Sequence, residues 1–231
     1  EMGPEVAWNL REMVKAQART NMAFGIPTIA GKDSSSGTFG KGKNRINVPY
    51  TFVLAIAFKM PDVRKVITKP FKKAGNALVW VGPCNPDALG GSVYLDCYGE
   101  RGDTLPNPIF GNLGHDYYAL NAAQTLNTGF IVSATAIGDG GLFMKLFEMA
   151  YGSGLGASVS LSQLSSEGRP DGILFGEQIG SILLEVDMDF EGVNQTFSYE
   201  GLLTRRIGWV LDTPRLLIGH QRKTILDISI D

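Results

Sequence analysis

A glycine-rich turn that leads directly into an amphipathic helix is the feature that most constrains this chain. Residues 137–161 read IGDGGLFMKLFEMAYGSGLGASVSL, in which Asp139, Gly140 and Gly141 precede the helical pattern. Asp139 is expected to cap this helix, because the first backbone N–H groups of a helix have no acceptor within it. Helix N-termini of this kind also attract phosphate. The turn therefore predicts either a site for a phosphorylated ligand or a capped helix start that binds nothing.

A second glycine turn lies near the N-terminus. Gly31, Lys32, Asp33 and Ser34 follow a predicted helix over residues 4–24 and a short apolar run. Backbone N–H groups of such a turn can surround phosphate oxygens, the Lys32 ammonium group supplies positive charge, and the Asp33 carboxylate can bind Mg²⁺. The alternative is an ordinary polar turn, which this stretch alone favours. Two glycine turns in one chain nevertheless make a phosphorylated ligand the leading hypothesis.

Composition excludes several classes of function. The 231 residues are 44% hydrophobic, which is enough for a core, and they carry a net charge of −2 with acids and bases interspersed. No basic stripe favours nucleic acid, and the longest apolar run, residues 52–58, is too short to span a bilayer. The N-terminal sequence lacks the order of a signal peptide, and the two cysteines have no C-x-x-C spacing. We therefore expect a cytoplasmic chain that binds neither nucleic acid nor membrane.

Helical and strand patterns mix without a strict β-α-β order. Helices are expected over residues 4–24, 113–127 and 197–204, and directly after the turn at Asp139. Strands are expected at residues 46–60, 77–81, 130–134, 157–161, 181–186, 207–211, 216–218 and 224–228. The mixture predicts an α+β fold, with an open mixed sheet and helices packed on one side.

Several short motifs occur in the order found in one enzyme family. They are Ile26-Pro27 with Gly31-Lys32-Asp33-Ser34, Asp62-Val63-Arg64, Lys73-Ala74-Gly75-Asn76, Leu89-Gly90-Gly91-Ser92-Val93-Tyr94, Asp139-Gly140-Gly141-Leu142 with Glu148-Met149-Ala150, and Leu174-Phe175 with Glu177 and Gly180. The ordered set resembles the second half of the phosphoribosylformylglycinamidine synthases, and more broadly the C-terminal domain of the aminoimidazole ribonucleotide synthetase superfamily. The resemblance implies the C-terminal part of an ATP-binding-type A domain at residues 1–72, and a C-terminal α+β domain at residues 73–231.

The resemblance also implies a function, that of an ATP-dependent carbon–nitrogen ligase of purine biosynthesis. Members of the family convert formylglycinamide ribonucleotide to formylglycinamidine ribonucleotide with ATP, Mg²⁺ and glutamine. On this basis both glycine turns would contact phosphate of the nucleotide or the substrate, and Asp33 and Asp62 would bind Mg²⁺. The Asp62 side chain is equally well interpreted as a cap for the following turn. No cysteine stands on a G-x-C-x-G elbow, so a glutaminase is expected in another domain or subunit, and the isolated chain is expected to be inactive.

Departures from the family pattern leave other interpretations open. Where the family has His, Asp and Ser before its Asp-Gly-Gly turn, this chain has Thr135, Ala136 and Gly138. The chain is alternatively a non-catalytic half of the enzyme that holds a structural nucleotide, or an interaction module. A related kinase of the selenophosphate or thiamine phosphate type is disfavoured by the motifs at residues 62–64, 89–94 and 174–177. Exposed apolar surface is expected on the A-domain part, through which a dimer could form.

Overall fold

The computed structural model describes residues 3–32, 37–48, 51–60, 62–106, 129–187 and 203–230. The chain forms two compact units, Glu1–Val63 and Arg64–Asp231, and each is described by itself. This division lies N-terminal to residue 72, where the sequence predicts a domain boundary. The assignment of residues 1–72 to an ATP-binding-type domain stays a prediction.

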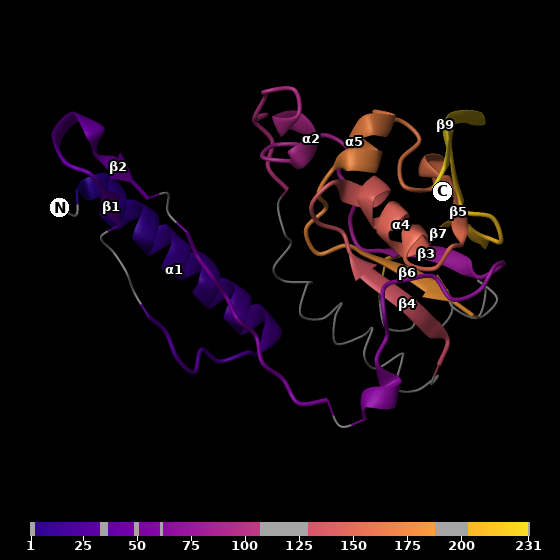
Figure 1. Ribbon diagram of the computed structural model, residues 1–231, viewed down its shortest axis with the longest axis horizontal. Coiled ribbons are helices and arrows are strands. Elements are labelled where there is room, and N and C mark those ends of the chain that lie inside the picture. Colours follow the sequence, from indigo (N-terminus) through magenta and orange to yellow (C-terminus); the bar gives the residue numbers. More distant parts are fainter. Residues whose placement is uncertain are drawn as a thin grey trace. The chain divides into compact units, whose positions relative to one another are not determined.

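The first unit contains one long helix and a small hairpin (Figure 1). Helix α1 spans Pro4–Phe24, as predicted, and ends at Gly25, where a φ of 63° turns the chain out of the helix. This left-handed conformation is the usual glycine stop of a helix. Strands β1, Thr38–Phe39, and β2, Ile46–Asn47, pair antiparallel around the 3₁₀ turn η1, Gly42–Asn44.

The long strand predicted at residues 46–60 is not formed. Strand β2 covers only Ile46–Asn47, and residues 51–60 have neither helix nor strand. A strand is stable only when its backbone groups pair with a neighbour, and in the described part of this unit the only strand pairing is that of β1 with β2. Large apolar side chains of the segment are instead exposed, namely Phe52, Val53, Leu54, Ile56 and Phe58. An apolar pattern without a pairing partner did not produce a strand.

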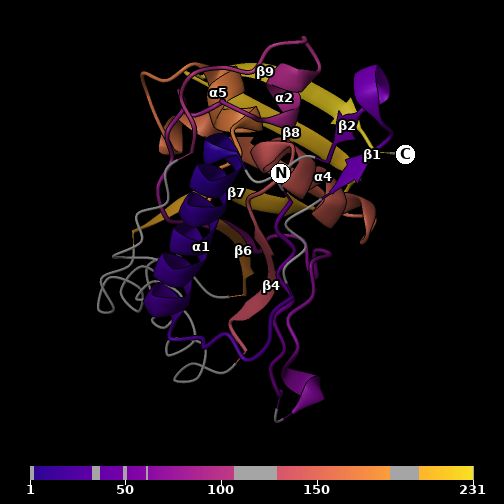
Figure 2. The same ribbon diagram turned by 90° about the vertical axis from the view of Figure 1, so that its left-hand side faces the viewer.

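The second unit is built on a seven-stranded mixed sheet with the order β4-β6-β3-β7-β5-β8-β9. Figures 1 and 2 show this sheet extending from β4 at one edge to the yellow strands β8 and β9 at the other. The strands are β3 (Ala77–Val81), β4 (Ile131–Ala136), β5 (Gly156–Ser160), β6 (Ile182–Val186), β7 (Thr204–Leu211), β8 (Arg215–His220) and β9 (Lys223–Ser229). Neighbouring strands are antiparallel except β5 and β8, which are parallel.

Helices α4, Gly141–Tyr151, and α5, Pro170–Phe175, pack on one another and on the same face of this sheet (Figure 1). The described residues from Val63 onward also form three shorter helical pieces, η2 (Val63–Lys65), α2 (Val93–Asp96) and η3 (Leu161–Gln163). The main core lies between the helices and the sheet and includes Trp80, Leu142, Leu146, Met149, Ile173 and Leu183. A smaller cluster lies on the opposite face and includes Val79, Val81, Ile131 and Leu184. The α+β prediction, with helices on one side of a mixed sheet, is confirmed.

Most predicted strands of this unit are present with small shifts at their ends, and β7 begins earlier than predicted, at Thr204. The helix predicted at residues 197–204 is therefore wrong at its last two residues, because Leu203 has neither helix nor strand and Thr204 begins β7, while residues 197–202 lie outside the described part. The helix predicted at residues 113–127 also lies outside it. Within the described residues, no helix is both long enough and apolar enough to cross a membrane.

Candidate functional site

Three loops leave the sheet side by side at one of its ends. The strand register aligns the last residue of β4, Ala136, with the first of β6, Ile182, and aligns Ile182 with the last residue of β3, Val81. The segments that follow β4 and β3 and the segment that precedes β6 therefore meet at the same end of these strands. These loops are residues 137–141, 82–92 and 176–181.

The turn at Asp139 lies in the first of these loops and begins helix α4. Gly140 is the N-cap residue with a φ of 74°, and Gly141 has a φ of 64°. Both values fall in the left-handed region that favours glycine. A Cβ atom on Gly141 would lie 2.5 Å from the backbone carbonyl carbon of Phe175, at the end of α5. The glycines therefore allow the turn to lie directly against α5.

Asp139 does not cap helix α4, contrary to the sequence prediction. The N-cap residue is Gly140, which has no side chain to cap the helix, and the neighbouring Asp139 is exposed. The carboxylate at this helix start comes from Glu177, whose Oε1 accepts the N–H of Gly140 at 3.2 Å and the N–H of Val93 at 2.8 Å. Negative charge beside a helix N-terminus is favourable. Glu177 thus has the role that the sequence assigned to Asp139.

Two further side chains of the loop before β6 bond to the loop at residues 82–92. The Gln178 side chain accepts the N–H of Asn85 at 2.8 Å and donates to the carbonyl oxygen of Asn85 at 2.9 Å. The Ser181 hydroxyl donates to the carbonyl oxygen of Pro83 at 2.6 Å. Gln178 and Ser181 are buried. The loop before β6 therefore fixes both other loops of the sheet end through hydrogen bonds.

An aromatic pair connects α2 with α5 beside these loops. The Tyr94 ring stacks on Phe175 with 4.8 Å between ring centroids, and its hydroxyl donates to Asp171 at 3.0 Å. This hydrogen bond, with some burial, raises the pKa of Tyr94 to about 12. The Arg169 guanidinium, helped by the Tyr94 hydroxyl, outweighs burial and lowers the pKa of Asp171 to about 2.

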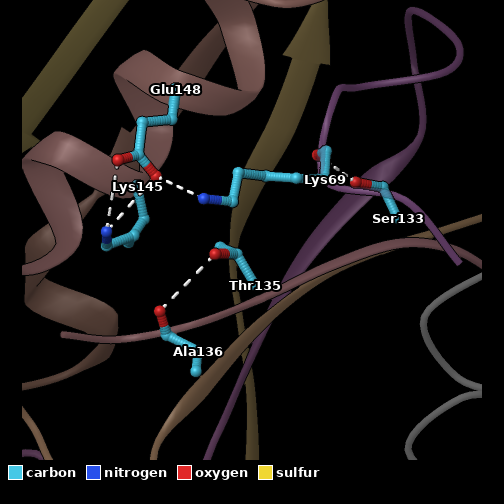
Figure 3. A network of polar contacts seen from close by, with 6 residues as sticks. All are labelled: Lys69, Ser133, Thr135, Ala136, Lys145 and Glu148. Atoms are coloured by element: carbon cyan, nitrogen blue, oxygen red, sulfur yellow. Dashed lines mark hydrogen bonds and ion pairs between the residues drawn. The ribbon is translucent and has the colours of Figure 1, made fainter.

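A second polar group lies between α4 and the edge strand β4 (Figure 3). The Glu148 carboxylate accepts hydrogen bonds from the Nζ of Lys69 at 2.8 Å and from the Nζ of Lys145 at 3.2 and 3.3 Å. Burial raises the pKa of Glu148, but the two ammonium groups together outweigh burial and hold that pKa below its ordinary value. Figure 3 shows the Thr135 side chain of β4 pointing toward the same group. Two lysines thus share one carboxylate.

The residues predicted to bind phosphate and Mg²⁺ fall in both units. Gly31 and Lys32 are exposed and lie in a segment without helix or strand, and Asp62 is half-buried just before η2. Asp33 and Ser34 lie outside the described residues. Since the two units are described separately, the grouping of these residues with the turn at α4 stays a prediction.

The sequence prediction missed Glu185, a fully buried carboxylate on β6. It accepts the backbone N–H of Lys72 at 2.8 and 3.1 Å, the N–H of Lys73 at 3.0 Å and the Asn76 side chain at 2.8 Å. The available signal was an acid within an apolar strand, because a buried carboxylate requires buried donors. Glu185 fixes the segment that enters β3, so its role is structural.

The fold and the site together define a class of protein: an α+β domain that places a glycine turn and a helix N-terminus at the end of a mixed sheet. Residues 73–220 match the family described as "AIR synthase related protein, C-terminal domain". The chain belongs to this family, and the predicted resemblance is confirmed.

Two curated relatives of this chain share one enzyme name. The chain is 29% identical over 228 residues to the phosphoribosylformylglycinamidine synthase subunit PurL of Thermoplasma acidophilum, covering 98% of this chain and 28% of that protein. It is 29% identical over 222 residues to the phosphoribosylformylglycinamidine synthase of Drosophila melanogaster, covering 87% of this chain and 16% of that protein. The chain therefore spans less than a third of the length of the curated relatives it matches.

Solved structures show the same fold. T. maritima PurL complexed with FGAR matches with a TM-score of 0.63 and 15% identity, over 73% of this chain and 29% of that chain. T. maritima PurL complexed with ATP matches with a TM-score of 0.55 and 15% identity, over 73% of this chain and 27% of that chain. At this level of identity the likeness establishes the fold alone.

Proposed function

We propose that this chain is part of a phosphoribosylformylglycinamidine synthase, the ATP-dependent ligase that converts formylglycinamide ribonucleotide to formylglycinamidine ribonucleotide in purine biosynthesis. The observation that carries the proposal is the match of 98% of the chain to a PurL subunit. Because the matched part is only 28% of that relative, complete catalysis requires more polypeptide than these residues. The isolated chain is expected to be inactive.

The ligands proposed for this chain are ATP or ADP and formylglycinamide ribonucleotide. T. maritima PurL has been solved with ATP, with ADP and with FGAR. In the present chain Gly31, Lys32, Asp33 and Ser34 would bind a nucleotide phosphate, since a lysine beside backbone N–H groups suits phosphate oxygens. The chain would thereby contribute one part of a site completed by other domains.

The turn at Asp139 is the second proposed phosphate contact, but its backbone N–H donors already have acceptors within the protein. The N–H of Gly140 is bonded to Glu177 at 3.2 Å, and the N–H of Gly141 is bonded to the carbonyl oxygen of Gly138 at 2.8 Å. A phosphate that used these two donors would have to displace both acceptors. Phosphate binding at the turn therefore requires a rearrangement of Glu177.

Magnesium fits the chain only together with ligand oxygens. Among the described residues, no group of three or more His, Cys, Asp or Glu side chains is placed to hold a metal ion. Mg²⁺ needs just one or two carboxylates when phosphates and waters complete its shell, and Asp62 and Asp33 are the proposed ligands. When bound, the ion would neutralise charge on the phosphoryl group.

The proposed partners are the remaining domains or subunits of the synthase, including a glutaminase that supplies ammonia. One solved relative is described as PurLQS from Thermotoga maritima. The exposed apolar side chains of residues 51–60 are a surface through which such a partner, or a second copy in a dimer, would bind. A cytoplasmic location follows from the proposed pathway.

A second candidate function is a non-catalytic half that holds a structural nucleotide. The resemblance places Thr135 and Ala136 of β4 where the family has an ionisable His-Asp pair. Threonine and alanine cannot transfer a proton near neutral pH. In this case a nucleotide would remain bound through purification and would not be consumed when substrate and glutamine are added with the partner subunits.

Calorimetric titration of the chain with Mg·ADP tests the proposed function. Lys32→Ala should weaken binding by about tenfold or more, the loss expected for one charged contact. Lys43→Ala is the matched control, because Lys43 is an exposed lysine of the same unit, and it should leave binding unchanged. An ADP affinity that Lys32→Ala leaves unchanged would contradict the proposed contact between residues 31–34 and a nucleotide phosphate.

A further inference from the structure

The polar group between α4 and β4 carries more positive than negative charge. The Lys145 side chain is 12% exposed and the Glu148 side chain 33%, and both belong to α4. The Lys69 side chain, from the segment before β3, is 46% exposed. Two ammonium groups therefore share a single carboxylate, which leaves a net charge of about +1 in a partly buried group.

The hydrogen-bonding capacity of this group is only partly satisfied by the described residues. Each ammonium group has three donors, yet in the described part of the chain the only ion pairs these two lysines make are with Glu148. Thr135 is 8% exposed, and within the described part of the chain its hydroxyl makes one bond, to the carbonyl oxygen of Ala136 at 3.5 Å. That distance is far beyond the usual O–H···O length. A buried hydroxyl and two lysines thus retain bonding capacity at one place.

The three elements that carry these groups are fixed to one another. Thr68 forms a parallel bridge with Ser133, and the Ser133 hydroxyl donates to the carbonyl oxygen of Lys69 at 2.5 Å. The N–H of Phe71 donates to the carbonyl oxygen of Met149 at 3.0 Å, which joins the same segment to α4. Figure 3 shows Lys69 extending from this segment toward Glu148, above Thr135. The arrangement is held by backbone contacts before any ligand arrives.

We propose that Lys69, Lys145 and Thr135 bind an oxyanion, a phosphate ester or a carboxylate, beside Glu148. The two ammonium groups would pair with the anion, the Thr135 hydroxyl would donate to one of its oxygens, and the added charge would balance the group. On α4, Lys145 lies about one helical turn after Gly141. The site uses none of the residues proposed to hold the nucleotide, so it stands or falls independently of Lys32.

Titration of the 231-residue chain with inorganic phosphate, at constant ionic strength, tests this site. The parent chain should bind phosphate saturably, and Lys145→Met should weaken binding by about tenfold, the loss expected for one charged hydrogen bond. Lys73→Met is the matched control, because Lys73 forms an exposed pair with Asp187 elsewhere in the same unit, and it should bind like the parent. A parallel titration with acetate distinguishes a carboxylate ligand from a phosphate ester.

Glu148→Gln separates a binding role from a purely structural one. Removing the shared carboxylate frees both ammonium groups, so an oxyanion site should bind phosphate several-fold more tightly in this variant. Thr135→Val should weaken binding by a few-fold without removing either charge. The proposal is overturned if the parent chain shows no saturable phosphate binding, if Lys145→Met binds like Lys73→Met, or if Glu148→Gln binds more weakly than the parent.

Discussion

The Oε1 atom of Glu177 lies 3.2 Å from the backbone nitrogen of Gly140 and accepts the N–H that opens helix α4. The same oxygen accepts the N–H of Val93 at 2.8 Å, so one carboxylate joins two loops of the sheet end. Asp139, the acid beside the glycines in the sequence, makes no capping bond. The charge that stabilises this helix start comes from a residue distant in sequence.

Glu177→Ala should therefore destabilise the chain, because it leaves two backbone donors without their charged acceptor. Bonds to a charged group are worth about 2 kcal/mol, and we expect a loss of about 2–3 kcal/mol in urea unfolding. Glu177→Gln keeps an acceptor oxygen and should lose less. Asp139→Ala and Glu167→Ala, both exposed carboxylates, should each change stability by less than about 0.5 kcal/mol. A large effect of Asp139→Ala would show that Asp139 does cap the helix.

The glycine turn gives a second prediction, which compares two glycines of one loop. Gly141→Ala should destabilise the chain by more than about 2 kcal/mol, because its φ is 64° and a Cβ would lie 2.5 Å from the carbonyl carbon of Phe175. Gly138→Ala should be tolerated, since a Cβ there has no atom within 4 Å. Thermal unfolding of both variants measures the difference. Equal stability of the two variants would contradict the contact between the turn and α5.

The sequence could predict this fold because its local signals agree with its packing in the second unit. The apolar runs that became β3 and β6 lie between neighbouring strands that pair with them. Residues 51–60 carry an equally apolar pattern, but no described strand pairs with them. Strand formation depends on a partner, and a sequence pattern does not contain that information when the partner is elsewhere.

The candidate site could be predicted only in part, for a similar reason. The glycines at positions 140 and 141 were identified because a turn before a helix needs them locally. The contribution of Glu177 arises from β-strand register, which brings residues 137–141 and 176–181 to the same end of strands β4 and β6. The ion pair of Lys69 with Glu148 likewise joins residues 79 positions apart. Contacts of this range follow from topology and have no short sequence signature.

Glu185 provides a third prediction, which concerns a buried charge. Its carboxylate is fully buried and accepts the backbone N–H groups of Lys72 and Lys73 and the Asn76 side chain. Glu185→Ala should lower the free energy of unfolding by about 3 kcal/mol or more, because the buried Asn76 side chain and two backbone N–H groups lose their charged acceptor. Glu185→Gln should also destabilise, since its amide group faces a backbone N–H donor. Urea unfolding of the two variants checks this. An effect below about 1 kcal/mol would indicate that water replaces the carboxylate.

Asp171 gives a prediction for the dependence of stability on pH. Hydrogen bonds from Arg169 and Tyr94 outweigh burial and lower the pKa of Asp171 to about 2, from an ordinary value of 3.8. A pKa that is lower in the folded chain adds stability at pH values above about 4, and this contribution is lost as the pH falls from about 4 toward 2. Because Arg169 is exposed, the contribution near neutral pH should be about 1 kcal/mol or less.

Urea unfolding of the parent chain and of Asp171→Asn between pH 7 and pH 2.5 measures this contribution. The stability difference between the two should be constant from pH 7 to about pH 5 and should shrink as Asp171 takes up a proton at lower pH. Asp139→Asn is the control, since the Asp139 carboxylate is exposed and makes no capping bond, and its stability difference from the parent should stay near zero throughout. A difference between parent and Asp171→Asn that grows toward low pH would mean that the folded chain favours the protonated form, and would reverse the assigned direction of the pKa shift.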